Sequence, residues 1–372
     1  MNLDFSDDQK FLQEEANKFF TKEDTLKRTR AIMESDEPYD KELWNKVIEL
    51  GWTAIRIPEE HSGLGLSHLE LCVIAEEIGK SLAPIPFSSS VYMYTEALIE
   101  SGNEVLKNTL LPCLADGSAV GTFAAAESLA PVSSENIQTV VTNNAVTGTK
   151  IAVPDVEAAT HVMVLCKNGN NVELRSVALD ASGVNVTLQA NIDPSKSFYQ
   201  IDFNDAESEL ISEDGWSRWE HLLDQAAVLV AFEQVGGAQA SLDMAKAYAM
   251  ERYAFGRAIG SYQAIKHKLA DMYISLTLAK SNCYYGAWAL SSGSSELGLA
   301  AATARVAATK AFQLCSKENI QTHGGNGFTW EYDCHLFYKR SKVLSLNLGS
   351  EAAWKEKLVT NLDKSNSIGS NQ

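Results

Sequence analysis

The sequence predicts an α+β protein in three parts: an N-terminal helical bundle, a middle antiparallel β domain and a C-terminal helical bundle. Apolar residues recur at helical spacing in the first third of the chain, and the same spacing returns in its last part. Between these regions lie short β-branched runs separated by turn-forming residues. The predicted domains are residues 1–118, 119–212 and 213–363, followed by a flexible tail at residues 364–372.

The N-terminal part has the spacing of amphipathic helices. Residues Phe11–Phe20 and Leu69–Ile78 each repeat apolar side chains at helical intervals, with charged residues between them. The segment 57–66 combines Pro58 with closely spaced glycines and a serine, which predicts an irregular loop.

The middle part is predicted to form strands, because its β-branched runs are bounded by Asn-Asn, Asn-Gly and Ser-Gly turn signals. The predicted strands are Val140–Thr142, Ala145–Thr149, His161–Leu165, Val172–Leu179, Gly183–Leu188 and Tyr199–Phe203.

The last part is predicted to form long helices whose alanine-rich faces allow close packing. The predicted helical segments are Leu222–Arg252, Ser261–Ser291, Ser295–Glu318 and Trp330–Leu362.

Composition excludes several classes of function. The 372 residues include 31 Lys and Arg against 48 Asp and Glu, a formal net charge of −17. A nucleic-acid binder needs a basic field to displace counterions from phosphates, so we expect no nucleic-acid partner. No stretch approaches the roughly 18 uncharged apolar residues of a membrane span, and the acidic start is unlike a secretory signal, so we expect an unprocessed cytoplasmic protein. The six cysteines show no metal-binding or disulfide spacing, which predicts reduced thiols and no metal site.

Common enzyme signatures are missing or incomplete. Residues Gly79–Ser81 resemble the end of a phosphate-binding loop, but Ile74 occupies the position of that loop's first glycine. The sequence contains no GxSxG elbow and no HExxH motif, and Asp333–His335 is too tightly spaced to hold a metal without further ligands. Nucleoside-triphosphate, hydrolase and metalloenzyme functions are therefore disfavoured.

Two segments carry residues suited to a phosphate-bearing ligand. The first is Glu251–Gly256 with the downstream Gln263, and the second is Gln321–Phe328. A guanidinium such as that of Arg252 pairs well with a pyrophosphate, and glycines let a backbone lie close to a ligand. The ordinary alternatives are that Arg252 caps helix carbonyls and that the glycines form a plain helix-ending turn.

With these segments the chain resembles the acyl-CoA dehydrogenase family over nearly its whole length. The matching pieces stand in family order and spacing: Phe5–Gln9, Pro58–Gly65, Ala75–Gly79, Glu251–Gly256 and Gln321–Phe328. The resemblance implies an α, β, α subunit, FAD as cofactor and dehydrogenation of an acyl-CoA thioester at Cα–Cβ. It also implies an electron-transfer flavoprotein as the electron acceptor.

In that family each FAD is shared across a dimer, and the neighbouring subunit supplies contacts to the ADP half. The resemblance assigns this role, residue by residue, to Arg252, Phe255, Gln263, Gln321, Gly324 and Gly325.

The segments that hold the flavin half differ from the family. Where the family has Thr-Glu-Pro-Gly-x-Gly-Ser-Asp, residues 126–133 keep only Glu127. Where the family has Trp-Ile-Thr, this chain has Ala152–Pro154, and proline offers neither a hydroxyl nor an N–H to a flavin. The sequence therefore keeps the donated half of the shared site and lacks most of the other half.

The family's catalytic base is missing from its two usual positions. Removal of the α-proton needs a carboxylate within hydrogen-bonding reach. Leu348 replaces the glutamate of the family's Tyr-Glu-Gly-Thr turn, and the alternative helical position holds Ala226. Asp224 and Glu351 are nearby carboxylates, but a two-residue offset turns a helical side chain by about 200°. Neither substitutes without a rearranged backbone.

Retention of one half of a shared site indicates a subunit that works beside a different partner. In this respect the chain is similar to the heteromeric two-plus-two acyl-CoA dehydrogenases of bacterial steroid side-chain degradation. The expected partner is then a paralogous subunit, and a steroid side-chain CoA thioester is a candidate substrate beside fatty acyl-CoA. Two alternatives stay open: a self-sufficient homotetramer with a relocated base at Asp224, Glu351 or another carboxylate, and a catalytically inactive scaffold.

Overall fold

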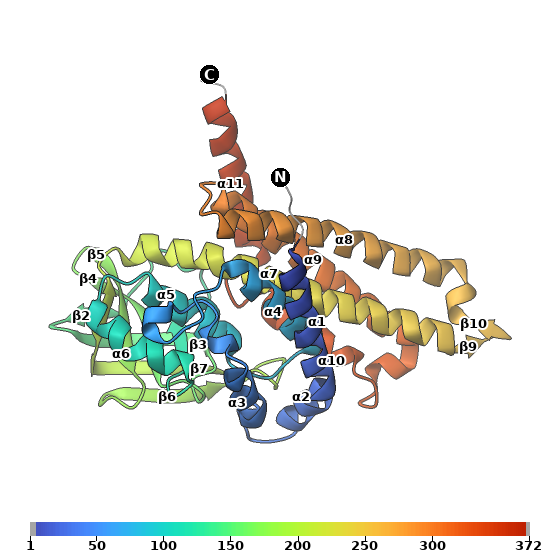
Figure 1. Cartoon of the computed structure of the whole chain (residues 1–372), viewed down its shortest axis with the longest axis horizontal. Helices are drawn as coiled ribbons and strands as arrows, with labels where there is room; N and C mark the ends of the chain where they lie inside the picture. Colours follow the sequence, from blue (N-terminus) through green and yellow to red (C-terminus); the bar gives the residue numbers. More distant parts are fainter. Residues whose placement is uncertain (1–4, 370–372) are drawn as a thin grey trace. The chain divides into compact units, whose positions relative to one another are not determined.

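The computed structural model describes residues 5–369, and side chains as far as residue 364 (Figure 1). The chain divides into two compact units made of non-contiguous segments. The helical unit comprises the residues up to 27, residues 68–83 and the residues from 227 onward. The sheet unit comprises residues 28–67 and 84–226. The boundaries drawn from the sequence at residues 118, 212 and 363 stay a prediction.

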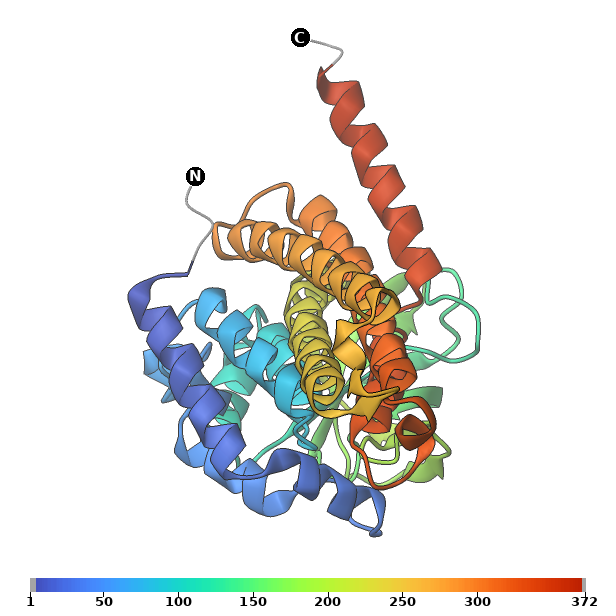
Figure 2. The same cartoon turned by 90° about the vertical axis from the view of Figure 1, so that its right-hand side faces the viewer.

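The helical unit is organised around α9, against which α8, α10 and α11 all pack. Helices α8 and α9 run side by side over much of their length (Figures 1 and 2). Helix α4 packs against α1 and α8. The elements of this unit are α1 (Asp7–Lys22), α4 (His68–Ser81), the C-terminal part of α7 (Gly215–Glu251), β9 (Tyr253–Ala254), β10 (Arg257–Ala258), η4 (Ile259–Ser261), α8 (Gln263–Ser291), α9 (Leu297–His323), η5 (Gly324–Phe328), α10 (Cys334–Leu344) and α11 (Glu351–Gly369).

Local sequence explains how several of these helices begin and pack. Ser6 and Gln9 form a reciprocal capping box at the start of α1, which satisfies two backbone donors. Helix α4 approaches the backbone of α7 at a glycine on each side. A Cβ added to Gly79 would lie 1.9 Å from the Glu233 carbonyl oxygen, and one added to Gly236 would lie 1.9 Å from that of Glu76. Only glycine allows this distance between the two helices.

The predicted helix over Trp330–Leu362 is wrong as a single element. The structure has two helices there, because α10 ends at Leu344 and α11 begins at Glu351. Gly349 has φ +100°, a backbone conformation that helical residues do not adopt, and it lies in the turn between the two helices. Of the predicted tail, residues 364–369 continue α11, and residues 370–372 lie outside the described residues.

The sheet unit contains the strands predicted for the middle of the chain, together with short helical elements. These elements are α3 (Lys41–Glu49), η1 (Trp52–Ala54), η2 (Glu59–His61), η3 (Ser88–Thr95), α5 (Glu96–Ile99), α6 (Glu104–Ala115), β1 (Gly121–Ala124), β2 (Val140–Thr142), β3 (Ala145–Pro154), β4 (His161–Asn168), β5 (Asn171–Ala178), β6 (Val184–Gln189), β7 (Phe198–Glu207) and β8 (Glu209–Ser212). Helix α2 (Thr25–Met33) is divided between the two units, as is α7.

The strands form one sheet in the order β6-β7-β3-β2-β4-β5-β8, with β1 added beside β4. Most pairings are antiparallel, as predicted, but β4 pairs in parallel with both β1 and β2. Strands β1 and β8 were not among the predicted strands, because each contains only one β-branched residue. One face of the sheet buries a core of mostly branched apolar residues: Val141, Val146, Val153, Val162, Val164, Val177, Tyr199, Ile201 and Phe203 among them.

The structure also bears on membrane spans, thiols and metal sites. No helix in the described part of the chain is long and apolar enough to cross a membrane. All six cysteines are free thiols, and five of them are buried. Within residues 5–369, no group of three or more His, Cys, Asp and Glu side chains is placed to hold a metal ion.

Candidate functional site

Three helix ends of the helical unit meet where the predicted ADP-binding residues lie. Helix α7 ends at Glu251, and the β9-β10 hairpin connects it to the start of α8 (Figure 1). Helix α9 ends at His323 and continues into η5. Stacking of the Tyr248 ring on the His323 ring, with centroids 4.0 Å apart, joins α7 to α9. An ion pair between Lys268 and Glu318 joins α8 to α9. The structure thus brings the two sequence segments together.

The side chains predicted to contact ADP are exposed at these helix ends. Arg252, Gln263 and Gln321 are exposed, and Phe255, at the tip of the hairpin, is 97% exposed. Within the described residues, the Arg252 guanidinium has no hydrogen-bond or ion-pair partner. Its backbone N–H donates to the Tyr248 carbonyl at 2.9 Å, so the helix end needs no help from the side chain. The alternative that Arg252 caps helix carbonyls is wrong.

The glycines of η5 leave open space beside the backbone. Gly324 has φ +61° and ψ −132°, which only glycine adopts readily, and it ends α9. A Cβ added to Gly324 or Gly325 would meet no atom within 4 Å. A Cβ added to Gly327 would lie 2.4 Å from the Ile320 carbonyl oxygen. Packing within the chain therefore accounts for glycine at 327 and leaves the space at 324 and 325 available to a ligand.

These residues fit the ADP half of FAD. The free guanidinium can pair with a pyrophosphate, the two free amides can donate to phosphate or ribose oxygens, and an exposed ring offers a face for stacking. Tyr262 supplies no side-chain cap to the N-terminus of α8, and the N–H groups at a helix N-terminus favour an anionic ligand.

The sheet unit contains the segment that the family uses for the flavin half, and its surviving residue Glu127 has internal partners. The Glu127 carboxylate accepts three hydrogen bonds: from the Lys150 ammonium at 2.7 Å, from the Gln138 backbone N–H at 2.5 Å and from the Thr139 backbone N–H at 2.9 Å. Lys150 is fully buried and also donates to the Ala125 carbonyl at 3.2 Å. Burial opposes ionisation, but the Lys150 charge and these hydrogen bonds hold the pKa of Glu127 below its usual range.

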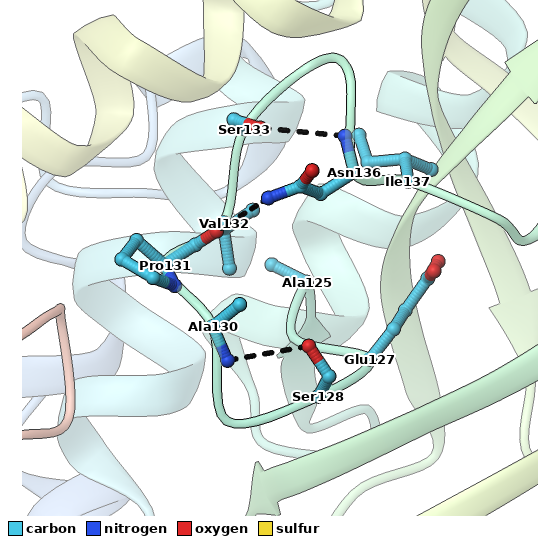
Figure 3. A pocket seen from close by; sticks show the side chains of 9 residues that line it. All are labelled: Ala125, Glu127, Ser128, Ala130, Pro131, Val132, Ser133, Asn136 and Ile137. Atoms are coloured by element: carbon cyan, nitrogen blue, oxygen red, sulfur yellow. Dashed lines mark hydrogen bonds between the residues drawn. The ribbon is translucent and has the colours of Figure 1, made fainter.

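The loop that follows Glu127 is closed by its own hydrogen bonds and lines a small pocket (Figure 3). The Ala130 N–H donates to the Ser128 hydroxyl at 3.2 Å, and the Asn136 amide donates to the Pro131 carbonyl at 3.3 Å. The Asn136 N–H donates to Ser133. These polar groups are thus paired within the loop.

Strand β3 is bulged where the family places its flavin-contacting Trp-Ile-Thr. Ala152 has φ +53°, and its N–H donates to the Gln189 side chain at 2.9 Å. The Ile151 N–H donates to the Ala126 carbonyl, and the Pro154 carbonyl accepts the Thr122 hydroxyl. Because Pro154 has no donor and its neighbours are already paired, these residues do not fit the flavin half of FAD.

The first usual base position is part of the packed interior of the helical unit. Leu348 is 6% exposed, and its carbonyl accepts the Trp354 indole N–H at 3.0 Å. The same turn is held by the buried Arg305, which donates to the Leu344 carbonyl and to the Asn347 side chain. Glu351 begins α11 and accepts the Lys355 ammonium at 2.6 Å.

The second usual base position lies on α7 within the sheet unit. Ala226 is completely buried. Asp224 is half-buried, and its charge contributes to a raised pKa of His221, to which hydrogen bonding with Glu100 is the largest contribution. The roles of Asp224 and Glu351 as bases stay predictions.

Some residues that shape these regions were not identified from the sequence. Lys150 lies in a strand, where a buried ammonium has no periodic signature. Tyr248 stands one helical turn before Arg252, and His323 and Asn326 lie inside the segment already singled out, so proximity in sequence was the only available signal.

A mostly antiparallel sheet unit and a unit of long helices give the acyl-CoA dehydrogenase fold. The acyl-CoA dehydrogenase N-terminal domain model matches residues 6–118, and the C-terminal domain model matches residues 213–360. The chain belongs to the acyl-CoA dehydrogenase family, whose members use FAD.

Relatives and solved structures agree with this assignment. The chain is 31% identical over 313 residues to acyl-CoA dehydrogenase IpdE2 of Mycobacterium tuberculosis, covering 84% of each chain. It is 30% identical to IpdE2 of Mycolicibacterium smegmatis, covering 92% of this chain and 95% of the relative. The structure of the Tcur3481-Tcur3483 steroid ACAD variant superposes with a TM-score of 0.89 at 26% identity, covering 97% of this chain and 99% of the other.

Proposed function

We propose that this chain is an acyl-CoA dehydrogenase subunit that contributes the ADP half of a shared FAD site to a paralogous partner. The partner then holds the flavin and dehydrogenates the acyl-CoA at Cα–Cβ. One observation carries the proposal: the groups suited to ADP are exposed and have no partner among the described residues, whereas the groups at the flavin-holding positions are replaced or paired within the chain. A family site divided in this way is complete only with a second, different chain.

The residues of this chain would bind and orient the cofactor. Arg252 would neutralise pyrophosphate charge, and Gln263 and Gln321 would fix its neighbouring oxygens through their amides. The open backbone at Gly324 and Gly325 would allow close approach, and Phe255 would cover one face of the bound group. When bound, FAD supplies the acceptor for the two electrons that leave the substrate.

Proton removal is assigned to the partner in this proposal. Leu348 and Ala226 cannot accept a proton, and an α-proton is removed only by a base within hydrogen-bonding reach. Electrons would leave to an electron-transfer flavoprotein. The likeness to a structure described as a steroid ACAD supports a steroid side-chain CoA thioester as the substrate class.

Co-expression tests the proposal. The chain produced alone is expected to bind FAD weakly or not at all, because only the ADP contacts are present. Produced with an acyl-CoA dehydrogenase paralogue encoded beside it, it is expected to give a yellow complex with about one FAD per two chains. A yellow homotetramer with one FAD per chain would instead establish the self-sufficient enzyme.

Substrate and base are tested on the same complex. Reduction of an artificial electron acceptor is measured with steroid side-chain and fatty acyl-CoA thioesters. Replacing the partner's base by glutamine should abolish turnover, whereas Asp224→Asn and Glu351→Gln in this chain should not. Loss of turnover in either of these two variants would place the base here.

A further inference from the structure

Four side chains form a compact cluster beside the candidate ADP site, which we call the aromatic clamp: Tyr248, His323, Asn326 and Tyr332. The Tyr248 and His323 rings stack with an interplanar angle of 26°. The Tyr332 ring packs edge-on against both, with centroid distances of 5.8 Å and 5.5 Å. The Asn326 amide donates to the Tyr248 hydroxyl at 3.0 Å and, more weakly, to the Tyr332 hydroxyl at 3.4 Å. The clamp therefore joins α7 to the end of α9 and to η5.

Three of the four clamp residues lie next to, or one helical turn from, a residue predicted to contact ADP. Tyr248 lies one turn before Arg252, whose N–H donates to the Tyr248 carbonyl. His323 directly precedes Gly324, and Asn326 directly follows Gly325. Contacts among the clamp residues therefore hold the segment around Arg252 in a set position relative to Gly324 and Gly325.

The His323 ring is held in one orientation by a hydrogen bond from its Nδ1. Its Nδ1 lies 2.9 Å from the Asn319 carbonyl oxygen, which can only accept, so Nδ1 carries the proton. The side chain is 5% exposed, and burial lowers the pKa of His323. One turn earlier, the Asn319 amide contacts the Met244 sulfur at 3.3 Å, a second contact between α9 and α7.

We propose that the aromatic clamp residues are positioning residues that hold the Arg252 segment and the Gly324–Gly325 segment in the arrangement that binds the ADP half of FAD. This inference rests on the proposed function. Within the described residues, the Arg252, Gln263 and Gln321 side chains have no partners that would fix them. Their placement depends on the backbone that carries them, and a preorganised backbone lowers the entropy lost on binding.

The clamp differs from ordinary apolar packing in its polar end. Asn326 lies in η5, and one amide bridges the phenol oxygens of α7 and of the segment before α10. The Asn326 carbonyl separately accepts from the N–H and the hydroxyl of Thr329, so the turn itself does not need the amide. Removing the Asn326 amide contact should therefore disturb the position of the Arg252 segment relative to Gly324 and Gly325 more than it lowers the stability of the fold.

The test measures the Kd for FAD and the melting temperature of the flavin-depleted complex with the partner subunit. Tyr248→Phe keeps the stacked ring and removes the hydroxyl, and Asn326→Ala removes the same contact from the other side. Each is expected to raise the Kd for FAD about three- to tenfold. The matched control is Tyr285→Phe, which loses a hydroxyl bonded to Glu296 at 2.8 Å, about 30 Å along α8 from Gln263. It should change the melting temperature by a similar amount and leave the Kd unchanged.

A double variant separates positioning from general destabilisation. If the clamp acts through Arg252, adding Tyr248→Phe to Arg252→Ala should weaken FAD binding little beyond Arg252→Ala alone. Effects that multiply, or unchanged FAD affinity in both Tyr248→Phe and Asn326→Ala while Arg252→Ala weakens binding, would overturn the clamp and leave the proposed function standing. Unchanged FAD affinity in Arg252→Ala would overturn the proposed function and the clamp's role together.

Discussion

The helix ends around Arg252 and the loop around Glu127 differ in whether the side chains that match the family are paired within the chain. At the helix ends the Arg252, Gln263 and Gln321 side chains are exposed and have no partners within the described residues. At the loop the carboxylate is bonded to a buried lysine and two backbone donors. The first region keeps the family's residues, whereas the second keeps only Glu127, and that carboxylate is already paired within the chain.

The difference teaches how a retained residue should be judged. A glutamate that matches the family and pairs with a buried ammonium stabilises the fold, because removing it would leave a buried charge without a partner. An exposed arginine without a partner contributes little to stability and is available to a ligand. Substitutions at the two regions should therefore separate into effects on unfolding and effects on FAD binding.

The largest expected effect is that of Glu127→Gln on stability. Lys150 would lose its carboxylate in a fully buried position, and breaking such a pair lowers the free energy of unfolding by about 3 to 5 kcal/mol. The measurement is a urea unfolding curve of the purified complex. Glu351→Gln, the control, breaks a pair that is partly open to solvent and should change stability by under about 0.5 kcal/mol. Equal losses of stability in Glu127→Gln and Glu351→Gln would contradict the structural role given to Glu127.

Leu348→Glu should come next in size. It restores the family's base in the sequence, but it places a carboxylate among buried side chains and removes a packed leucine, for a loss of about 2 to 4 kcal/mol. It should create no acyl-CoA dehydrogenase activity, because base, α-carbon and flavin must align together. Turnover by this variant with an inactivated partner would show that the flavin half is present in this chain.

Arg252→Ala should act on binding and leave the fold intact. A charge-assisted contact to pyrophosphate contributes about 1.5 to 3 kcal/mol, so FAD affinity of the complex should fall roughly ten- to more than a hundredfold. The unfolding midpoint of the flavin-depleted complex should stay the same, because no bound FAD then contributes to stability. Arg257→Ala removes the same charge from the same hairpin, where the guanidinium lies over the Tyr262 ring, and serves as the control. Equal loss of flavin in both variants would indicate a general charge effect.

The glycines of η5 offer a matched pair with a smaller effect. Gly327→Ala should cost about 1 to 3 kcal/mol of stability, because its Cβ would collide with the Ile320 carbonyl. Gly325→Ala should leave stability unchanged and weaken FAD binding, because its Cβ would enter only the open space. Thermal unfolding and flavin retention after dialysis measure the two effects. Full flavin retention in Gly325→Ala would argue against close approach of FAD there.

The smallest effect concerns pH. The Lys150 charge and the hydrogen bonds to Glu127 hold the folded-state pKa of Glu127 below its ordinary value of 4.5, so the ion pair stabilises the protein fully above that pH. Its contribution is lost as the pH falls below about 4.5 and through the folded-state pKa. The stability difference between wild type and Glu127→Gln should therefore shrink on acidification. A difference that stays constant from pH 7 to pH 3 would contradict the role given to the carboxylate.

Much of the fold could be predicted because its signals are local. The runs at Val140–Thr142 and Val172–Leu179 became strands β2 and β5 almost residue for residue, since β-branched side chains and flanking turns report a strand directly. The helices from residue 215 onward followed the apolar spacing. The single helix over Trp330–Leu362 was wrong because the turn holding Leu348 is itself apolar and carries no strong breaker before Gly349.

By itself, the sequence determined the order of helices and strands, the family, and which residue types stand at the ADP and base positions. Only the tertiary structure decided which of those groups are free. Burial of Lys150 against Glu127, stacking of Tyr248 on His323 and the packed state of Leu348 all join residues far apart in the chain. Periodicity reports which face of an element is buried, but a pairing between elements depends on how they pack in three dimensions.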